Sequence, residues 1–568
     1  HCTEDINGDH GLLVKIVTRR RKTVDCFFAR EEMATEKDTT KLLLKKGLNV
    51  PNLKPEHCYA LNFYLNNFQP EFKAIGVDMV GWQADNTTYM LPFIDEPRNC
   101  YSSKTEDEKS VEYILQQKGA VLRALKKKGT LEEWKRTVGQ VCKGNQLHTF
   151  AILVSLTAPA LKLLGEEGGV VHYVGSTSIG KSTILQVAKS VWGFEELGSF
   201  RATHNSLEGI CKNSNDGVTF LDEMGEANAE DISKIIYMIG NGVTKSRADI
   251  KGNAKAITHF KVLAQSTGEI GIEAKLAEKN IQVKGGQLMR TVELDADRGK
   301  GFNTFDVLNK NPDTGELFAT GREQAEYLKT HAKENCGVVI DSFLQEVVVK
   351  VDDYKKALKE AKAEWLKRKF TGNEGAEVAR VAKKFSTIFA SGVIAVELGI
   401  IPHSIEEIDA CVDAMFKNWL NRFGGDTPYE LKVIMANIYK LCVENQYSRL
   451  INAHPTEDER VNLPSNTVGY WKKEKVILKD GTVSLLEDGT VEWVLSEYWI
   501  RTLEFERDAL KGQDKKVFYP LLVENGYILK GSGKGYTQSR RPAKENSQNF
   551  IIIPSSAFRD VEGFGENE

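Results

Sequence analysis

The chain has 568 residues, with a hydrophobic content of 41%, a charged content of 27% and a formal net charge of −3. This length exceeds what a single core organises and predicts three or four domains at about 150 residues each. The near-neutral charge excludes a globally basic nucleic-acid binder, so any DNA contact must come from local patches. No apolar run approaches the ~18 residues that span a membrane, so we expect no membrane partner.

The 9 cysteines are scattered, without a C-x-x-C pair or a Cys/His spacing of the zinc type. This pattern favours reduced thiols in a cytoplasmic protein over a disulfide framework. The chain begins at His1 without a signal-peptide pattern, so we expect it to be a piece of a longer protein.

Residues 1–128 are expected to form a small α/β domain. Residue patterns predict strands at 12–17 and 23–29, helices at 39–46 and 55–67, and a hairpin at 81–92. The two strands are joined by a basic turn, Arg19 to Lys22. We interpret this turn as a solvated hairpin tip, with contact to a DNA backbone as the alternative.

An ATPase core is expected over residues 129–321. Thr130 and Glu133 are spaced as a helix capping box. Residues 147–164 predict a mostly apolar helix broken at Pro159, which leads the chain to the next motif.

Residues 170–183 carry the most specific motif of the chain. An apolar, β-rich run is followed by G-x-x-x-x-G-K-[ST] and then by a helical pattern, the context that a phosphate-binding loop requires. The candidate nucleotide-binding residues are Gly175, Ser176, Thr177, Ser178, Ile179, Gly180, Lys181, Ser182 and Thr183. Lys181 is expected to reach the β- and γ-phosphates of ATP, and the Ser182 hydroxyl to hold Mg²⁺.

A second strand is predicted at 217–221, about 40 residues beyond Lys181, and it ends in Asp222 and Glu223. Apolar residues followed by two carboxylates form a Walker B pattern. Asp222 is expected to hold Mg²⁺, and Glu223 to orient and polarise the attacking water. The adjacent pair favours the AAA+ class over RecA-like motors.

A helix is predicted at 231–240 and a third core strand at 259–266, which ends at Ser266 and Thr267. A hydroxyl at this strand end is expected to contact the γ-phosphate or the attacking water, with Thr267 as the first choice and Ser266 as the second. The intervening segment supplies three candidate DNA-binding cations, Arg247, Lys251 and Lys255. They predict either a ring-pore hairpin that contacts a nucleic-acid backbone or a solvated loop.

Arg290 stands between a glycine turn and a β-run over residues 282–294. It is a candidate arginine finger that reaches the nucleotide of a neighbouring subunit and stabilises transition-state charge. A structural salt bridge is the competing role.

Residues 322–450 are expected to form a helical lid. Helices are predicted at 354–369, 377–398 and 405–423. Arg380 could face the nucleotide as a sensor arginine, and pairing at the surface is the alternative.

Residues 485–556 are expected to form a winged-helix-like module, with helices at 497–506 and 515–525 and a strand at 550–553. Arg540, Arg541 and Lys544 would lie on the wing and contact DNA phosphates. Modules of this kind also mediate protein contacts, so a protein-binding role is the alternative to DNA binding.

The chain resembles the AAA+ replication helicases of mobile genetic elements, including the MCM-like helicases of staphylococcal cassette chromosomes and pathogenicity islands. These proteins share a domain long catalogued as being of unknown function. The resemblance runs from about residue 10 to about 425 and rests on Gly81-Trp82 with Leu91-Pro92, the run from Gly129 to Trp134, Gly144-Asn145, the run from His172 to Ser182, the run from Ser266 to Glu269, Gly286-Gln287 with Arg290, and Arg380 with Phe385. It implies a ring-forming, ATP-driven DNA helicase that acts when the element replicates.

Together, these features predict an α/β protein with an AAA+ P-loop ATPase core, an N-terminal α/β domain, a helical lid and a winged-helix-like C-terminal module. The expected function is a Mg²⁺-dependent, ring-forming DNA helicase, expected to be a hexamer, with a primase or initiator as a possible partner. The main alternative is an ATP-gated initiator or loader that binds DNA without processive unwinding. A regulatory NTP switch is a third hypothesis.

Overall fold

A computed structural model of the chain divides it into two compact units, His1–Gly425 and Asp426–Glu568. It describes residues 2–558 apart from 6–9, 50–52, 69–72, 78, 94–98, 104–111, 116–124, 196–197, 201–203, 223, 245–256, 280, 282–288, 371–374, 424–428, 456–465, 479–481, 487, 532–534 and 543–544. Each unit is described by itself.

The first unit begins with a five-stranded sheet covered by two helices. Its strands lie in the order β3-β2-β1-β4-β8. The elements are β1 (Cys2–Asp5), β2 (His10–Val17), β3 (Thr23–Ala29), α1 (Glu36–Lys45), α2 (Pro55–Asn67), β4 (Lys73–Val77) and β8 (Glu112–Leu115). Leu12, Ile16 and Phe28 of the sheet form one buried cluster with Leu43 of α1 and Leu65 of α2. The predicted strands and helices of this region are therefore confirmed.

The predicted hairpin forms part of a separate three-stranded sheet, β5 (Gly81–Trp82), β6 (Thr88–Met90) and β7 (Cys100–Ser102). Its aromatic residues pack into the same core as the P-loop helices. The Trp82 indole donates a hydrogen bond to the Pro159 carbonyl (2.8 Å), and the Tyr101 hydroxyl donates one to Asp341 (2.5 Å). This segment is thus fixed to the central part of the unit.

The central sheet is parallel, with the strand order β10-β11-β12-β9-β13. The strands are β9 (Gly169–Val174), β10 (Gly198–Ser199), β11 (Gly217–Asp222), β12 (Val262–Gly268) and β13 (Thr291–Asp295). Every residue of β9 and β12 is buried, as expected for parallel strands covered on both faces.

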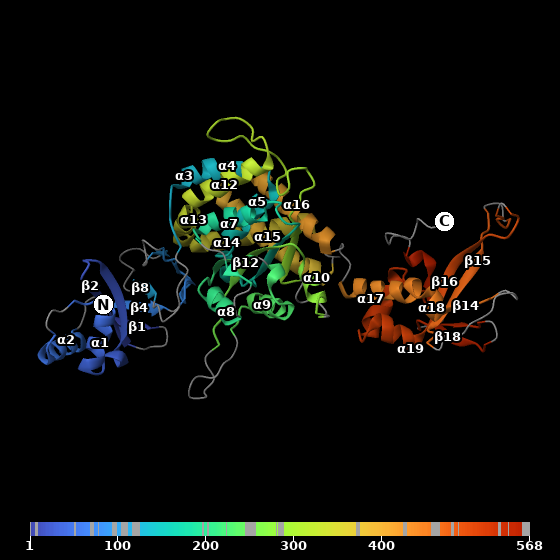
Figure 1. Cartoon of the computed structure of the whole chain (residues 1–568), viewed down its shortest axis with the longest axis horizontal. Helices are drawn as coiled ribbons and strands as arrows, with labels where there is room; N and C mark the ends of the chain where they lie inside the picture. Colours follow the sequence, from blue (N-terminus) through green and yellow to red (C-terminus); the bar gives the residue numbers. More distant parts are fainter. Residues whose placement is uncertain are drawn as a thin grey trace. The chain divides into compact units, whose positions relative to one another are not determined.

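Helices cover both faces of this sheet because side chains alternate along each strand. On β9, Val171 and Tyr173 face the cluster that contains α5 (Gln146–Thr157) and α7 (Lys181–Trp192), whereas Val170 faces the cluster that contains α9 (Ala229–Asn241). Figure 1 shows α5 and α7 on one side of β12, with α8 (His204–Lys212) and α9 on the other.

Most of the remaining helices of the first unit belong to the cluster around α5 and α7, whereas α10 packs with α9 on the other face of the sheet. Their bounds are α3 (Leu131–Trp134), α4 (Gln140–Cys142), α6 (Ala160–Leu164), α10 (Ile272–Ala277), α12 (Gly321–Glu334), α13 (Val338–Val349), α14 (Val351–Lys369), α15 (Ala376–Glu397) and α16 (Ile405–Phe423). Thr130 caps α3 by accepting from the Glu133 amide (3.2 Å), as its capping-box spacing predicts. None of the described helices is long and apolar enough to cross a membrane.

The second unit is a five-stranded sheet with its own core, in the order β14-β15-β16-β18-β17. Its elements are α17 (Tyr429–Tyr439), α18 (Gln446–Arg449), β14 (Leu450–Asn452), β15 (Gly469–Lys475), β16 (Trp493–Arg501), α19 (Thr502–Phe505), α20 (Lys515–Glu524), β17 (Gln538–Arg540) and β18 (Gln548–Pro554). The expected lid range, 322–450, therefore ends too late, because residues from Asp426 onward, including α17, belong to this second unit.

The helix predicted at 497–506 is wrong over its first half, because residues 497–501 belong to strand β16, whereas Thr502–Phe505 form α19. Tyr498 and Ile500 are buried in one cluster of the unit, and Trp499 is buried in another. A segment with apolar side chains on two opposite faces is better satisfied between sheet neighbours than in a short helix.

Candidate functional site

The P-loop connects the carboxyl end of β9 to the amino end of α7. Gly180 has φ +97° and Ser178 has φ +65°, so the backbone takes left-handed conformations at two positions of this loop. No side chain caps the amino end of α7. Its first N–H groups therefore remain available to an anion, and the helix dipole adds favourable charge there.

Lys181 lies at this loop, with its Nζ donating to the carbonyls of Gly175 and Ser176 (both 2.6 Å). Partial burial lowers its pKa, and this effect is opposed by the nearby carboxylates of Glu269 and Asp222. The side chain is therefore held beside the phosphate-binding loop and faces two acids across the cavity.

Asp222 and Thr267 meet at the carboxyl ends of adjacent strands. Leu221 pairs with Ser266 in the parallel register of β11 and β12, so the next residue of each strand lies at the same edge. The Thr267 hydroxyl donates a hydrogen bond to the Asp222 carboxylate. Thr267, the first choice for the hydroxyl at this strand end, therefore contacts Asp222, the aspartate of the Walker B pattern.

Ser266, the second choice, has a different partner. It lies on the other face of β12, where its hydroxyl bonds the Nδ1 of His172 (2.8 Å). His172 is fully buried, and burial lowers the pKa of its imidazole. Ser266 therefore helps to hold two central strands together and does not face Asp222.

These residues surround a cavity of about 470 Å³ whose described lining is Thr177, Ser178, Gly180, Lys181, Ser182, Asp222, Gly225, Thr267, Gly268, Glu269 and Ile270. Among the residues described, no group of three His, Cys, Asp or Glu side chains could hold a metal by itself. The donor set, one hydroxyl and one carboxylate beside a phosphate-binding loop, fits Mg²⁺ bound together with a nucleotide.

Glu269 was not assigned a role from the sequence, although it lines this cavity. Its position two residues beyond Thr267, just after the end of β12, is the signal that could have identified it. Glu223, Arg247, Lys251, Lys255 and Lys544 lie outside the described residues.

Arg290 lies at the amino ends of the central strands, opposite the carboxyl ends that the P-loop follows. Its carbonyl accepts from the Val170 amide (2.9 Å) at the amino end of β9, whereas the P-loop follows the carboxyl end. Its guanidinium bonds Asn241 (2.7 Å) and lies over the ring of Tyr237. The five residue steps from Val170 to Gly175 span roughly 16 Å, so Arg290 cannot reach the P-loop of its own chain.

Arg380 lies at the same strand ends as Arg290 and is not brought to the P-loop of its own chain. It pairs with Glu167 (2.5 Å), two residues before β9 begins. Lys384, one turn further along α15, donates to the Gly168 carbonyl (3.1 Å), and burial lowers its pKa to about 8. In the sequence, only the one-turn spacing of Lys384 from Arg380 could have indicated that the two residues lie close together.

The two arginines proposed for the wing differ in accessibility. Arg540 is half-buried, 3.8 Å from Glu497 and over the ring of Trp499. Arg541 is exposed, and its Nε donates to the Glu545 carbonyl (3.4 Å). Arg541 is therefore the one of the pair more able to contact an external phosphate.

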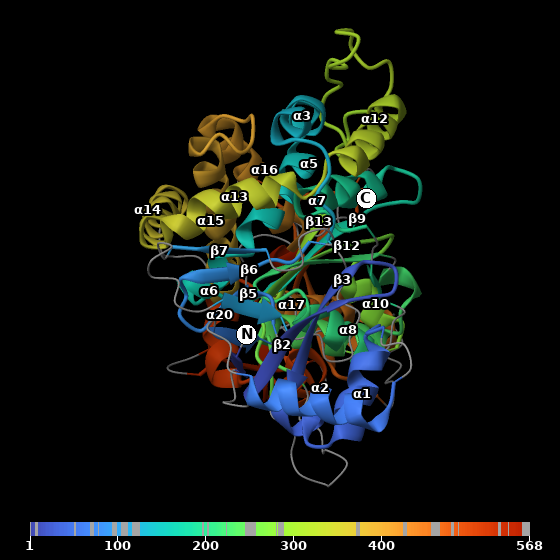
Figure 2. The ribbon, with the colours of Figure 1, turned by 90° about the vertical axis from the view of Figure 1, so that its left-hand side faces the viewer.

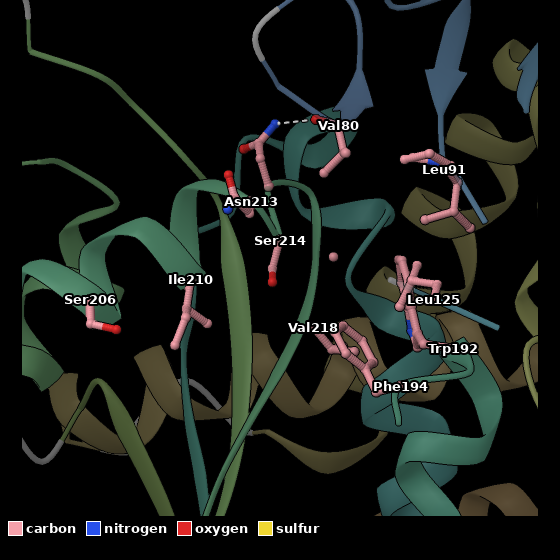
Figure 3. Close-up of a pocket in the computed structure, with 13 residues that line it drawn as sticks. Val80, Leu91, Leu125, Trp192, Phe194, Ser206, Ile210, Asn213, Ser214 and Val218 are labelled. Carbon is pink, nitrogen blue, oxygen red and sulfur yellow. Dashed lines mark hydrogen bonds between the residues drawn. The ribbon is translucent and has the colours of Figure 1, made fainter. Parts of the chain in front are cut away.

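A separate cavity of about 290 Å³ lies at the amino end of β11, away from the P-loop (Figure 3). Val80 and Leu91 line it from the N-terminal region, and Trp192, Phe194 and Val218 from the central region. None of the described lining side chains is titratable, so the described part of this cavity offers no general acid or base. The reactive groups gather at the P-loop.

Comparisons with known proteins gave matches to a family model and to solved structures. Residues 2–259 match the family described as Domain of unknown function (DUF927). The structure titled "SCCmec type IV Cch - active helicase" is 17% identical and has a TM-score of 0.66, over 97% of this chain and 92% of that one. NtrX from Brucella abortus in complex with ATP is 14% identical over 32% of this chain and 38% of that one, and its TM-score of 0.18 is too low to indicate a shared fold.

No curated protein matches the chain. The family match and the fold match nevertheless point the same way as the resemblance seen in the sequence. The resemblance is therefore confirmed as a family match and a shared fold: residues 2–259 match the DUF927 family, and the chain shares its fold with the structure titled as an active helicase of SCCmec type IV.

Proposed function

We propose that this chain is a Mg²⁺-dependent ATPase of the AAA+ type that assembles as a ring and translocates on DNA to unwind it. The observation that carries the proposal is the meeting of Lys181, Asp222 and Thr267 in one cavity, with Arg290 at the opposite strand ends of the same sheet. The strand order, in which β12 separates the P-loop strand from the Walker B strand, supports the AAA+ assignment.

In this proposal, the chain's own groups bind and orient ATP. The P-loop amides and the amino end of α7 hold the phosphates, and Lys181 contacts the β- and γ-phosphates. Ser182 and Asp222 would hold Mg²⁺, which neutralises charge on the phosphates when it is bound. Thr267 orients Asp222, and Glu223 would polarise the attacking water.

The nucleoside part of ATP has room on the other side of the loop. A second cavity of about 430 Å³ is lined there by Ser178, Gly180 and Thr183 of the P-loop region and by residues of α12. The hydroxyls of Thr183 and Thr304 are buried near Gly180 without a hydrogen-bond partner among the described residues. Unpaired buried hydroxyls are costly, and a ribose or base would supply partners.

The site is proposed to be completed by a second copy of the chain. Arg290 and Arg380 lie together at the amino ends of the central strands, too far from the P-loop of their own chain to contact it. In a closed ring with head-to-tail contacts, these strand ends would face the P-loop of the next subunit. Both arginines would then stabilise phosphate charge in that neighbour. A hexamer is the expected ring, and a primase or initiator remains a possible partner.

DNA as the track is proposed from the fold shared with a helicase, which is an associational argument. Lys251 and Lys255, with Arg247, are the proposed contacts in a ring pore, and Arg541 with Arg540 the contacts of the second unit.

The test combines ATP hydrolysis with strand separation. Lys181→Ala should abolish ATP hydrolysis, and the wild type should displace a strand from a forked duplex only when ATP and Mg²⁺ are both present. Exposed Lys359→Ala is the matched control and should behave as wild type. Hydrolysis and DNA binding without any strand displacement would instead support the initiator or loader alternative.

A further inference from the structure

Helix α2 presents four aromatic rings to solvent. Tyr59, Phe63, Tyr64 and Phe68 are 57%, 56%, 56% and 46% exposed. The rings form two pairs at i,i+4 spacing, with centroids 6.0 Å apart for Tyr59 and Phe63 and 5.2 Å apart for Tyr64 and Phe68. Two pairs of exposed aromatics along one short helix and its C-cap residue Phe68 indicate a contact surface.

These rings are not needed to hold α2 in place, because its other face does so. Leu65 is buried in the core of the N-terminal sheet. Asn62 and Asn66 donate to the Met33 carbonyl (2.9 and 3.2 Å), and Arg30 donates to the Asn66 carbonyl (2.9 Å). The aromatic face therefore remains available for a ligand.

Six exposed cations lie at one end of the helix pair: Arg19, Arg20, Arg21, Lys22, Lys45 and Lys46. The bridge between Thr18 and Leu48 joins the basic turn after β2 to the end of α1. Among the ion pairs of the described residues, none involves these six side chains. We name them the basic cluster.

The basic cluster lies at the end where α2 begins. Asn62 of α2 bonds Thr39 near the start of α1 (2.7 Å), and Asn66 reaches back to Met33, so the two helices are antiparallel. Figure 2 shows α1 and α2 side by side, as does Figure 1. The carboxyl end of α1, with Lys45 and Lys46, is therefore close to the amino end of α2, where Tyr59 lies.

We propose that the aromatic face of α2 and the basic cluster together bind single-stranded DNA. Exposed rings stack on bases without regard to sequence, and unpaired cations contact the phosphates that connect those bases. The one carboxylate of α2, Glu56, is 3.7 Å from Lys54. The exposed acids Glu31, Glu36 and Asp38 lie at the opposite end of the helix pair from the basic cluster, so little negative charge opposes a polyanion at the end where α2 begins. The inference rests on the proposed DNA-translocating function and adds a second DNA contact outside the pore.

A docking protein is the less suitable occupant. The centres of protein interfaces are depleted of lysine and other charged residues, whereas the amino end of α2 lies close to six cations that form no ion pair with the described residues. That charge is complementary to a nucleic-acid backbone.

The test uses the full-length chain and a fluorescein-labelled strand of thirty thymidines, titrated at several salt concentrations. The double variant Phe63→Ser/Tyr64→Ser should weaken binding by about thirtyfold or more, with an unchanged salt slope. Arg20→Gln/Lys46→Gln should instead flatten the slope of log K against log salt by about 1.4. Tyr447→Ser, at a ring that is 85% exposed in the second unit, is the control and should bind as wild type.

A strand carrying 5-iododeoxyuridine provides a second readout on the wild type, which does not depend on variants that fold. Irradiation should cross-link it to the peptide that contains residues 55–68. Absence of that cross-link, or thymidine binding within twofold of wild type in the aromatic variant, would overturn the proposal. So would an altered oligomeric mass with unchanged DNA affinity, since α2 would then contact a second copy. A wild type that binds no DNA at all would refute the proposed function itself.

Discussion

The Thr267 hydroxyl at the end of β12 helps to hold Asp222, the aspartate of the Walker B pattern. Thr267 and Ser266 are neighbours in sequence, yet alternation along the strand directs one to Asp222 and the other to His172. The Thr267 hydroxyl donates to this acid and so contributes to restraining its orientation. Orienting groups of this kind affect catalysis through the residue that they position.

Replacing Thr267 tests this role. Thr267→Ala should lower kcat for ATP hydrolysis by about a hundredfold with little change in KM, because the loss is in orientation rather than in nucleotide binding. Thr267→Ser keeps the hydroxyl and should retain most of the activity. Steady-state phosphate release measures both. Equal losses in the two variants would show that the methyl group matters, through packing, rather than the hydroxyl.

At the scale of elements, glycines set how closely the segments before and after the P-loop approach. Gly193 ends α7 with φ +82°, and its carbonyl accepts from the Lys126 amide (2.8 Å). A Cβ there would lie 1.9 Å from the Lys126 carbonyl oxygen. Gly165 ends α6 with a similar φ of +69° but has no atom within 4 Å of that position. The two glycines share a left-handed conformation, but only at Gly193 would an added Cβ collide with a neighbouring atom.

The pair separates backbone strain from steric contact. Gly165→Ala should cost about 1 kcal/mol of unfolding free energy, from the left-handed conformation alone. Gly193→Ala should cost about 1–3 kcal/mol more, because the segment at 125–128 must shift away from α7. Urea unfolding monitored by tryptophan fluorescence compares them. Equal unfolding midpoints would indicate that the contact with Lys126 relaxes freely.

Much of this arrangement of elements could be predicted because local patterns determine it. Helices α2 and α16 have the predicted bounds. Helix α16 has a clear apolar stripe that includes Ile408, Val412 and Met415, and α2 is delimited by Pro55 at its first position. Strand β16 was misread because Glu and Leu within it favour helix, and only its two-sided burial reveals a strand. Contacts between distant residues were not predictable. The packing of Trp82 on Pro159 and the pairing of Arg380 with Glu167 depend on how the whole unit folds.

At the scale of the whole molecule, the two ends of the central strands carry complementary halves of the proposed reaction site. Lys181 and Asp222 lie at the carboxyl ends of the strands, and Arg290 and Arg380 lie at their amino ends. One chain cannot join these halves, because β9 separates them by roughly 16 Å. Assembly of several copies into a ring would join every P-loop to the arginines of a neighbour.

Mixing two inactive variants tests that assembly. Lys181→Ala and Arg290→Ala should each lack ATP hydrolysis, the first through loss of phosphate contacts and the second through loss of transition-state stabilisation. In a ring mixed at random one to one, about a quarter of the interfaces would join an intact Lys181 to an intact Arg290, so about a quarter of wild-type hydrolysis should return. Arg290→Ala mixed with the Lys181→Ala/Arg290→Ala double variant is the control, because no intact arginine is present and no activity should return. Absence of recovery in the first mixture, with subunit exchange verified by labelled chains, would place the function of Arg290 within its own subunit fold and remove it from the neighbouring site.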